Sequence, residues 1–168
     1  MKLVFLDIDG VLNDFERSWG AVPDYNPEFV PRCVQNFNRI IRATEARIVL
    51  SSSWRHLIVF GHMSLNGFSV LLRSHSVRGH LIGHTREEAA SESSEPRWQQ
   101  IADYIKTHRE ANADGIERYC ILDDCSDAFG GRPGVRTDGS TGLTAADADL
   151  AIEILNTDGS LKKTADLD

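Results

Sequence analysis

The chain has 168 residues, of which 41% are hydrophobic and 26% are charged, and its formal net charge is −7. This length suits one folded domain, and there is no run of about 18 apolar residues of the kind that crosses a membrane. The acidic charge argues against a dedicated nucleic-acid-binding protein, which usually presents a basic face. Three cysteines without a CxxC pair argue against a disulfide framework or a zinc site. The start of the chain is too short for a signal peptide, so we expect a cytoplasmic protein.

Short apolar runs alternate with amphipathic stretches along the chain, as is typical of α/β folds with a parallel sheet. The expected strands cover residues 3–6, 47–50, 80–83, 119–122 and 135–137. The expected helices cover residues 27–44 with Pro27 in the first turn, 63–74, 96–108, and a last helix that Thr144 caps. Residues 14–26 and 85–96 are expected to be loops. The pattern predicts a three-layer α/β sandwich with a central, mostly parallel, Rossmann-like sheet, forming a single domain over residues 1–156 with a polar tail at 157–168.

Polar side chains follow the predicted strands at the points where those strands end. Asp7 and Asp9 follow the first strand, residues 51–53 are serines that follow the second, and Asp123 and Asp124 follow the strand at 119–122. Ligand sites of open α/β sheets form outside the carboxyl ends of the strands, so these groups are expected to meet. Clustered carboxylates repel one another unless a cation neutralises them. Ligands that are all oxygen favour Mg²⁺ over zinc, and the sequence therefore predicts a magnesium site.

The same residues resemble the motifs of a known superfamily. Residues 7–12, Asp-Ile-Asp-Gly-Val-Leu, resemble the first motif of the haloacid dehalogenase-like (HAD) superfamily, Ser51 resembles the second, and residues 123–124 resemble the fourth. The order and spacing match over about residues 3–127. Trp54-Arg55 and the compact length are similar to the small HAD domains of RNA-repair proteins. The short stretches between these motifs leave little room for a cap domain, so a capless or minimally capped fold is expected.

The resemblance implies a role for each matching residue. Asp7 would be the nucleophile that forms an aspartyl-phosphate, and it would also bind the metal. Asp9 would be the general acid and base, and its backbone carbonyl would be a metal ligand. Ser51 would donate a hydrogen bond to the transferred phosphoryl group. The other metal ligands would be Asp124 first and Asp123 second, with Asp127 in support.

The superfamily normally places a lysine before a helix to balance the charge of the phosphate, and no lysine lies between Lys2 and Lys106. Arg97 has the right order and context to replace it, although arginine and lysine differ in geometry. Arg55 is the competing candidate, and it is also a candidate for contacting the substrate phosphate. The substrate-binding residues that we expect are Ser52, Arg55 and Gly10. Trp54 is interpreted as a packing residue rather than a base-stacking one.

The predicted function is a Mg²⁺-dependent phosphomonoester hydrolase that acts through an aspartyl-phosphate. A nucleotide or polynucleotide 3′-phosphatase is the alternative among enzymes. A non-catalytic regulatory module that binds phosphate or metal is the alternative from another class. The substrate would be phosphorylated, but the sequence specifies neither its class nor the oligomeric state. A nucleic-acid substrate is compatible with the motifs and gains no support from the net charge.

Overall fold

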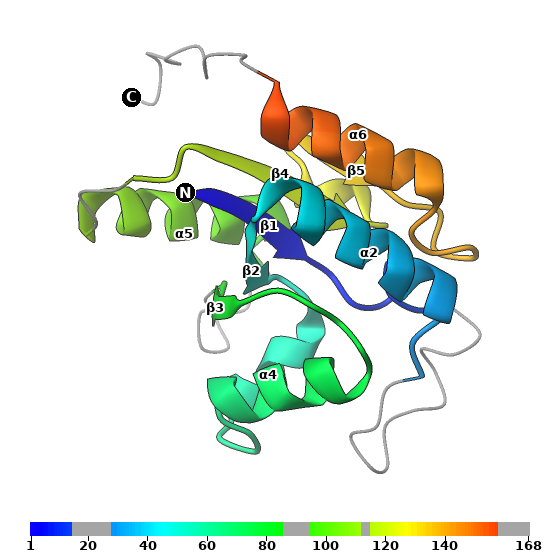
Figure 1. The fold of residues 1–168 in the computed structure, drawn as a ribbon. Coiled ribbons are helices and arrows are strands. Elements are labelled where there is room, and N and C mark those ends of the chain that lie inside the picture. Colours follow the sequence, from blue (N-terminus) through cyan, green and yellow to red (C-terminus); the bar gives the residue numbers. More distant parts are fainter. Residues whose placement is uncertain (15–27, 86–94, 112–114, 158–168) are drawn as a thin grey trace.

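The computed structural model describes residues 1–14, 28–85, 95–111 and 115–157 (Figure 1). Its strands form one five-stranded sheet in the order β3-β2-β1-β4-β5, and every neighbouring pair is parallel. The strands are β1 (Lys2–Leu6), β2 (Arg47–Leu50), β3 (Leu81–His84), β4 (Arg118–Asp123) and β5 (Gly134–Arg136). The prediction of a mostly parallel sheet is therefore confirmed, and β1 lies at its centre.

Helices cover both faces of the sheet (Figure 1). The α-helices are α2 (Pro31–Thr44), α3 (His56–Val59), α4 (Leu65–Ser74), α5 (Arg97–Ala111) and α6 (Ala145–Asn156), and the short 3-10 helices are η1 (Ser53–Arg55) and η2 (Ser126–Ala128). Residues of α2, α4 and α6 share one buried apolar cluster, whereas residues of α5 belong to a second cluster. The three-layer α/β sandwich expected from the sequence is thus confirmed. None of the helices in the described ranges is long and apolar enough to cross a membrane.

The central strand β1 is apolar on both sides, as a strand covered on both faces must be. Val4 and Leu6 pack into the cluster with α2 and α6, and Leu3 and Phe5 pack into the cluster with α5. Side chains alternate between the two faces of a strand. The residue that follows Leu6 is therefore directed to the α5 face, and this residue is Asp7.

The first long helix starts later than the sequence pattern suggested. We predicted Pro27 in its first turn, but α2 begins at Pro31, with Val30 as the N-cap. Proline is favoured in the first turn of a helix, because its φ suits the helix and the N–H that it lacks would have no partner there. Pro31 meets this requirement as well as Pro27 does. Pro27 itself lies outside the described residues. The last helix starts as predicted, because Thr144 caps it and Asp147 completes a capping box.

The remaining predicted elements are found within a few residues of their expected positions. Residues 53–59, for which no helix was predicted, form η1 and α3. Within the described parts of the stretches between the motifs, β3 pairs in the central sheet and α4 packs on its core, so neither forms a cap. Most of the two predicted loops (14–26 and 85–96) and most of the predicted tail (157–168) lie outside the described residues. The single domain over 1–156 stays a prediction.

Candidate active site

Three buried polar residues lie side by side at the carboxyl edge of the sheet. The parallel ladder extends past the strand ends, because the Ser51 backbone N–H donates to the Leu6 carbonyl and the Asp7 N–H donates to the Leu122 carbonyl, each at 2.9 Å. Asp123 ends the neighbouring strand β4. All three polar side chains are almost fully buried. The structure thus brings together the ends of β1, β2 and β4, as the sequence pattern predicted.

The carboxylates at this edge form a tight cluster. Asp7, Asp123 and Asp124 each offer one oxygen, and these oxygens lie within 4.8 Å of one another. Burial, followed by the charge of Asp7, raises the pKa of Asp123 to about 7 and also raises the pKa of Asp124. The charged cluster is therefore costly without a cation, and its oxygen ligands suit Mg²⁺. Asp127, the third alternative, is exposed on η2 and does not belong to this cluster.

Arg97, the first residue of α5, bridges two of the carboxylates. Its Nη1 donates to Asp7 Oδ2 at 2.6 Å and to Asp123 Oδ2 at 2.5 Å. Burial disfavours the charged guanidinium, but the two carboxylates outweigh that effect and raise the pKa of Arg97. Arg97 thus places a positive charge against Asp7, and its role as the motif's cation stays a prediction.

Arg55, the competing cation, is buried and has a different set of partners. Its Nη1 donates to the carbonyls of Ser51 and Ser52 at 2.8 and 2.9 Å, and its Nη2 donates to Gln100 Oε1 at 3.0 Å. Ser52 is buried as well, and its hydroxyl accepts a hydrogen bond from the Trp54 N–H at the start of η1. These bonds hold the loop after β2 against α5. Arg55 and the Ser52 hydroxyl thus position this loop, and the substrate contact that we expected of these two residues stays a prediction.

The hydroxyl of Ser51 has an unusual environment. Ser51 is fully buried, and its Oγ has no hydrogen-bond partner among the described residues. A buried hydroxyl that makes no hydrogen bond costs about 1–3 kcal/mol, so such a group is expected to have a partner in the working state of the protein. Ser51 is therefore in a position to donate to a ligand beside Asp7.

Gly10 allows the first motif to approach the fourth. Its φ is +71°, and a Cβ at this position would lie 2.7 Å from Cγ of Asp124. A larger residue would therefore be strained and would displace a member of the carboxylate cluster. The Gly10 N–H donates to Asn13 Oδ1 at 2.9 Å, so this donor is used within the turn. These contacts indicate that Gly10 shapes the site, whereas we had expected it to bind substrate.

Asp9 is held by two side chains that the sequence did not single out. Asn13 Nδ2 donates to one carboxylate oxygen at 2.9 Å, and the indole N–H of Trp54 donates to the other at 3.0 Å. Burial raises the pKa of Asp9, and these two hydrogen bonds partly oppose the shift. We had interpreted Trp54 as a packing residue. This contact could have been suspected from the residue type, because a partly buried indole N–H usually has a hydrogen-bond partner.

The edge strand β5 also fastens the site, which the sequence analysis did not anticipate. The hydroxyl of Thr137, just past the strand, donates to the Gly10 carbonyl at 2.7 Å, and its N–H donates to the Asp123 carbonyl at 3.0 Å. Arg136 Nε donates to the Asp124 carbonyl at 2.9 Å. The first and fourth motifs are therefore tied to one short strand.

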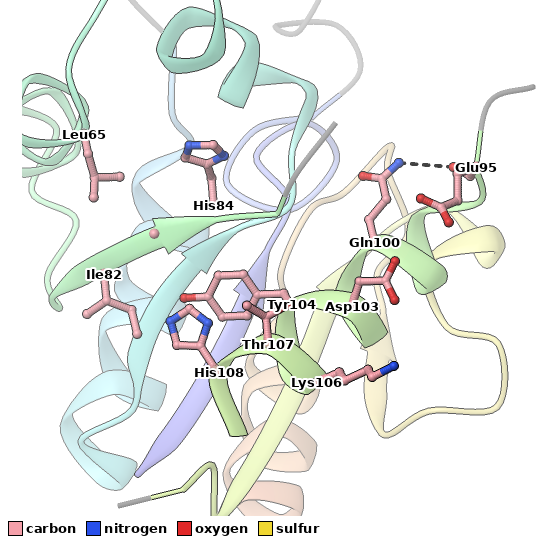
Figure 2. Close-up of a pocket in the computed structure, with 11 residues that line it drawn as sticks. Leu65, Ile82, His84, Glu95, Gln100, Asp103, Tyr104, Lys106, Thr107 and His108 are labelled. Carbon is pink, nitrogen blue, oxygen red and sulfur yellow. Dashed lines mark hydrogen bonds between the residues drawn. The ribbon is translucent and has the colours of Figure 1, made fainter. Parts of the chain in front are cut away.

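A cavity of about 650 Å³ lies between β3 and α5 (Figure 2). The stacked rings of Tyr104 and His108, with centroids 4.0 Å apart, form part of its wall. The three clustered carboxylates are not among the described residues that line it. Gln100 lines the cavity and accepts a hydrogen bond from Arg55, so the cavity adjoins the loop that carries Ser51.

Comparison with known proteins gave one result. The family model described as "HAD domain in Swiss Army Knife RNA repair proteins" matches residues 3–148. This range contains every residue of the site described above. No curated protein matches the chain.

Proposed function

Because the chain belongs to the family of HAD domains in Swiss Army Knife RNA repair proteins, we propose that it is a Mg²⁺-dependent phosphomonoester hydrolase that uses Asp7 as its nucleophile. Members of HAD families are generally hydrolases, which agrees with this class of activity. The observation that carries the proposal is the position of Asp7. It lies within the carboxylate cluster, and its Oδ2 accepts a hydrogen bond from Arg97 at 2.6 Å.

The first half of the reaction transfers the phosphoryl group to the protein. A carboxylate oxygen of Asp7 attacks phosphorus, the bond from phosphorus to the leaving oxygen breaks, and Asp9 donates a proton to that oxygen. Arg97 balances the negative charge beside Asp7, and the otherwise unpartnered Ser51 hydroxyl donates to a phosphoryl oxygen. The raised pKa of Asp9 favours the protonated carboxyl that this step requires.

In the second half of the reaction, Asp9 takes a proton from a water molecule that attacks phosphorus. The bond from phosphorus to the Asp7 carboxylate breaks, which releases inorganic phosphate and restores Asp7. Each Asp9 oxygen accepts a hydrogen bond from Asn13 or Trp54. When Asp9 is protonated, one of its oxygens also becomes an O–H donor, and the acceptor capacity that remains can keep the bonds from Asn13 and Trp54.

The donor set fits a magnesium ion. The side chains that we expect to hold it are Asp7 first, Asp124 second and Asp123 third, and the backbone carbonyl of Asp9 would be a further ligand. When bound, the ion supplies positive charge that offsets the negative charge of the phosphoryl oxygens and of the aspartates.

We expect magnesium to stabilise the protein more strongly at about pH 8 than at about pH 5.5. The pKa of Asp123 is raised to about 7 and that of Asp124 is also raised, so protons compete with the metal at the lower pH. At saturating Mg²⁺ the melting temperature should rise by about 5 °C at the higher pH. Thermal denaturation with sodium chloride of equal ionic strength is the control, and Asp124→Asn should reduce the shift. A shift that is the same at both pH values would exclude metal binding by these carboxylates.

Replacing Trp54 with phenylalanine should extend activity to higher pH. The indole N–H stabilises the charged form of Asp9, so its removal should raise the pKa of that carboxyl further. Because the proton donor must be protonated, the alkaline limb of the kcat/KM profile should move to higher pH. An alkyl phosphate is the suitable substrate, since its leaving group needs the proton. An unchanged or lowered alkaline limb would contradict the assignment of Asp9 as the acid.

A panel of phosphorylated compounds tests the proposed function as a whole. Release of phosphate from an aryl phosphate is measured with Mg²⁺ and with a chelator, and mononucleotides, end-phosphorylated oligonucleotides and phosphopeptides then compete with it. The family's description names RNA repair, which agrees with a nucleic-acid substrate and so with the narrower candidate, a nucleotide or polynucleotide 3′-phosphatase. Binding of Mg²⁺ without phosphate release from any compound would indicate a regulatory module instead. The combination of Asp7, Asp9, Ser51 and Asp124 argues against that outcome.

A further inference from the structure

One row of side chains crosses the whole sheet at its carboxyl edge. The strand registers pair Leu6 with Leu50 and with Leu122, and they pair Leu50 with His84 and Asp123 with Arg136. The next residue on β3, β2, β1 and β4 continues this register, and on β4 that residue is Asp123, which itself pairs with Arg136. The row therefore reads Thr85, Ser51, Asp7, Asp123 and Arg136. The three central members belong to the proposed phosphoryl-transfer site. Arg136, at one end of the row, has no role in the mechanism given above.

Arg136 faces the same side of the sheet as Asp123. Its neighbour Val135 packs into the cluster with α2 and α6, so the alternation of β5 directs Arg136 to the opposite face, where Arg97 contacts Asp123. Two strand spacings of about 4.8 Å place the Arg136 backbone about 10 Å from that of Asp7. An arginine side chain is long enough to shorten this separation considerably.

The guanidinium of Arg136 is exposed and oriented. Its Nε donates to the backbone carbonyl of Asp124 at 2.9 Å. This bond fixes the plane of the group next to the carboxylate cluster, while Nη1 and Nη2 are further donors of the same planar fork. Such a fork binds phosphate oxygens in a bidentate way, with more geometric specificity than an ammonium group has.

The negative charge around the site makes a cation at position 136 favourable for binding an anionic substrate. Asp7, Asp9, Asp123 and Asp124 all lie at this edge, and the whole chain has a net charge of −7. A polyanionic chain that enters the site is repelled by these groups unless a cation lies along its path. Arg97 already bridges Asp7 and Asp123, whereas the hydrogen bond of Arg136 goes to a neutral carbonyl.

We propose that Arg136 binds the phosphodiester adjacent to the terminal phosphate, and so makes this site prefer the phosphorylated end of a polynucleotide over other phosphomonoesters. This inference rests on the proposed function and specifies its substrate class. A nucleic-acid strand carries an anionic group one nucleotide from its terminal phosphate whatever its base sequence. A phosphopeptide has no anionic group at a fixed distance from its phosphate, so one arginine held beside the carboxylate cluster suits a polynucleotide better.

The test compares two short oligonucleotides with the same terminal phosphate. In one, the adjacent linkage is an ordinary phosphodiester, and in the other it is an uncharged methylphosphonate; each is made with the phosphate at the 3′ end and at the 5′ end. For the unmodified protein, kcat/KM should be about tenfold higher for the charged linkage at the preferred end, because a charge-assisted pair at an exposed site is partly screened by solvent. In Arg136→Gln this preference should fall to less than about twofold.

The ratio of the two substrates cancels any general effect of the substitution on folding or on Asp124. Arg47→Gln is the matched control, since it removes the same charge from an exposed arginine at the opposite edge of the sheet, and it should keep the preference. The proposal is overturned if Arg136→Gln keeps the preference, or if the unmodified protein shows none. Turnover of an aryl phosphate without turnover of either oligonucleotide would also overturn it and leave the hydrolase assignment intact.

If no compound is turned over, the proposed function fails. Binding of the same two oligonucleotides is then compared by fluorescence anisotropy, and the same preference for the charged linkage is expected.

Discussion

Replacing Asp7 with asparagine is expected to lower the turnover of an aryl phosphate by at least about four orders of magnitude. Asparagine is nearly isosteric with aspartate and can still accept the Ile8 N–H that now donates to Asp7 Oδ1 at 2.8 Å. Its amide oxygen is a poor nucleophile and cannot form the acyl-phosphate. The effect should therefore appear in kcat, with little change in the fold.

The control for this variant is Asp103→Asn, which makes the same substitution at an exposed position of α5 outside the carboxylate cluster. Phosphate release and thermal stability are measured for both variants. Turnover by Asp7→Asn within tenfold of the unmodified protein would show that another group is the nucleophile. A variant that is inactive but unfolded would be recognised by its loss of the cooperative melting transition, and Asp7→Glu would then replace it, since glutamate keeps the charge but misplaces the oxygen.

Replacing Arg97 with alanine is expected to lower kcat/KM by about 10²–10³-fold, the usual effect of removing one donor that stabilises the transition state. The metal-free protein should also lose about 3 kcal/mol of unfolding free energy near pH 8, because Asp7 and Asp123 would remain buried without their partner. The rate is measured with saturating Mg²⁺, and the stability is measured by denaturant unfolding in a chelator.

The loss of stability should shrink as the pH falls. Burial and the charge of Asp7 raise the pKa of Asp123 to about 7, and Arg97 opposes this shift, so alanine at position 97 should raise the pKa further. The folded protein then holds a proton that the unfolded chain releases, and its stability falls as the pH rises from about 4 through that pKa. The difference between the two proteins should thus be small near pH 5 and large near pH 8. An equal difference at both pH values would mean that the Arg97 contacts do not depend on a charged Asp123.

A lysine at position 97 distinguishes charge from shape. A single nitrogen, Nη1, makes both contacts of Arg97, so a lysine ammonium can replace its charge, although the side chain is shorter. Arg97→Lys should recover at least about tenfold of the rate lost in Arg97→Ala. Equal rates for the two variants would show that the reach and planarity of arginine matter more than its charge.

The sequence was sufficient to predict that Asp7, Ser51 and the carboxylates at 123–124 would meet. Each follows an apolar run that reads as a strand, and parallel strands place their carboxyl ends at one edge. The position of Arg97 could be predicted for a similar reason, since it follows Pro96 at the start of an amphipathic helix. Its second partner, Asp123, could not be predicted, because that contact depends on how the end of β4 turns.

Contacts between distant segments were outside the reach of sequence patterns. Trp54 and Asn13 both donate to Asp9, although Trp54 is 45 positions away. Arg55 is buried because Gln100 and two backbone carbonyls accept its hydrogen bonds, and neither strand nor helix periodicity reports such a network. Arg136 lies beside Asp124 only because β5 pairs with β4, which is a matter of strand order rather than of local sequence.

Detection of a phosphorylated Asp7 would identify the nucleophile of the reaction. In Asp9→Asn with nitrophenyl phosphate, the weakly basic leaving group needs no proton, whereas hydrolysis of the intermediate needs the missing base. We predict a burst of about one equivalent of nitrophenolate per protein, followed by slow turnover. Acid quenching and borohydride reduction should then convert residue 7 to homoserine, detected by peptide mass spectrometry. A burst without homoserine at residue 7, or phosphate trapped on another residue, would contradict the account.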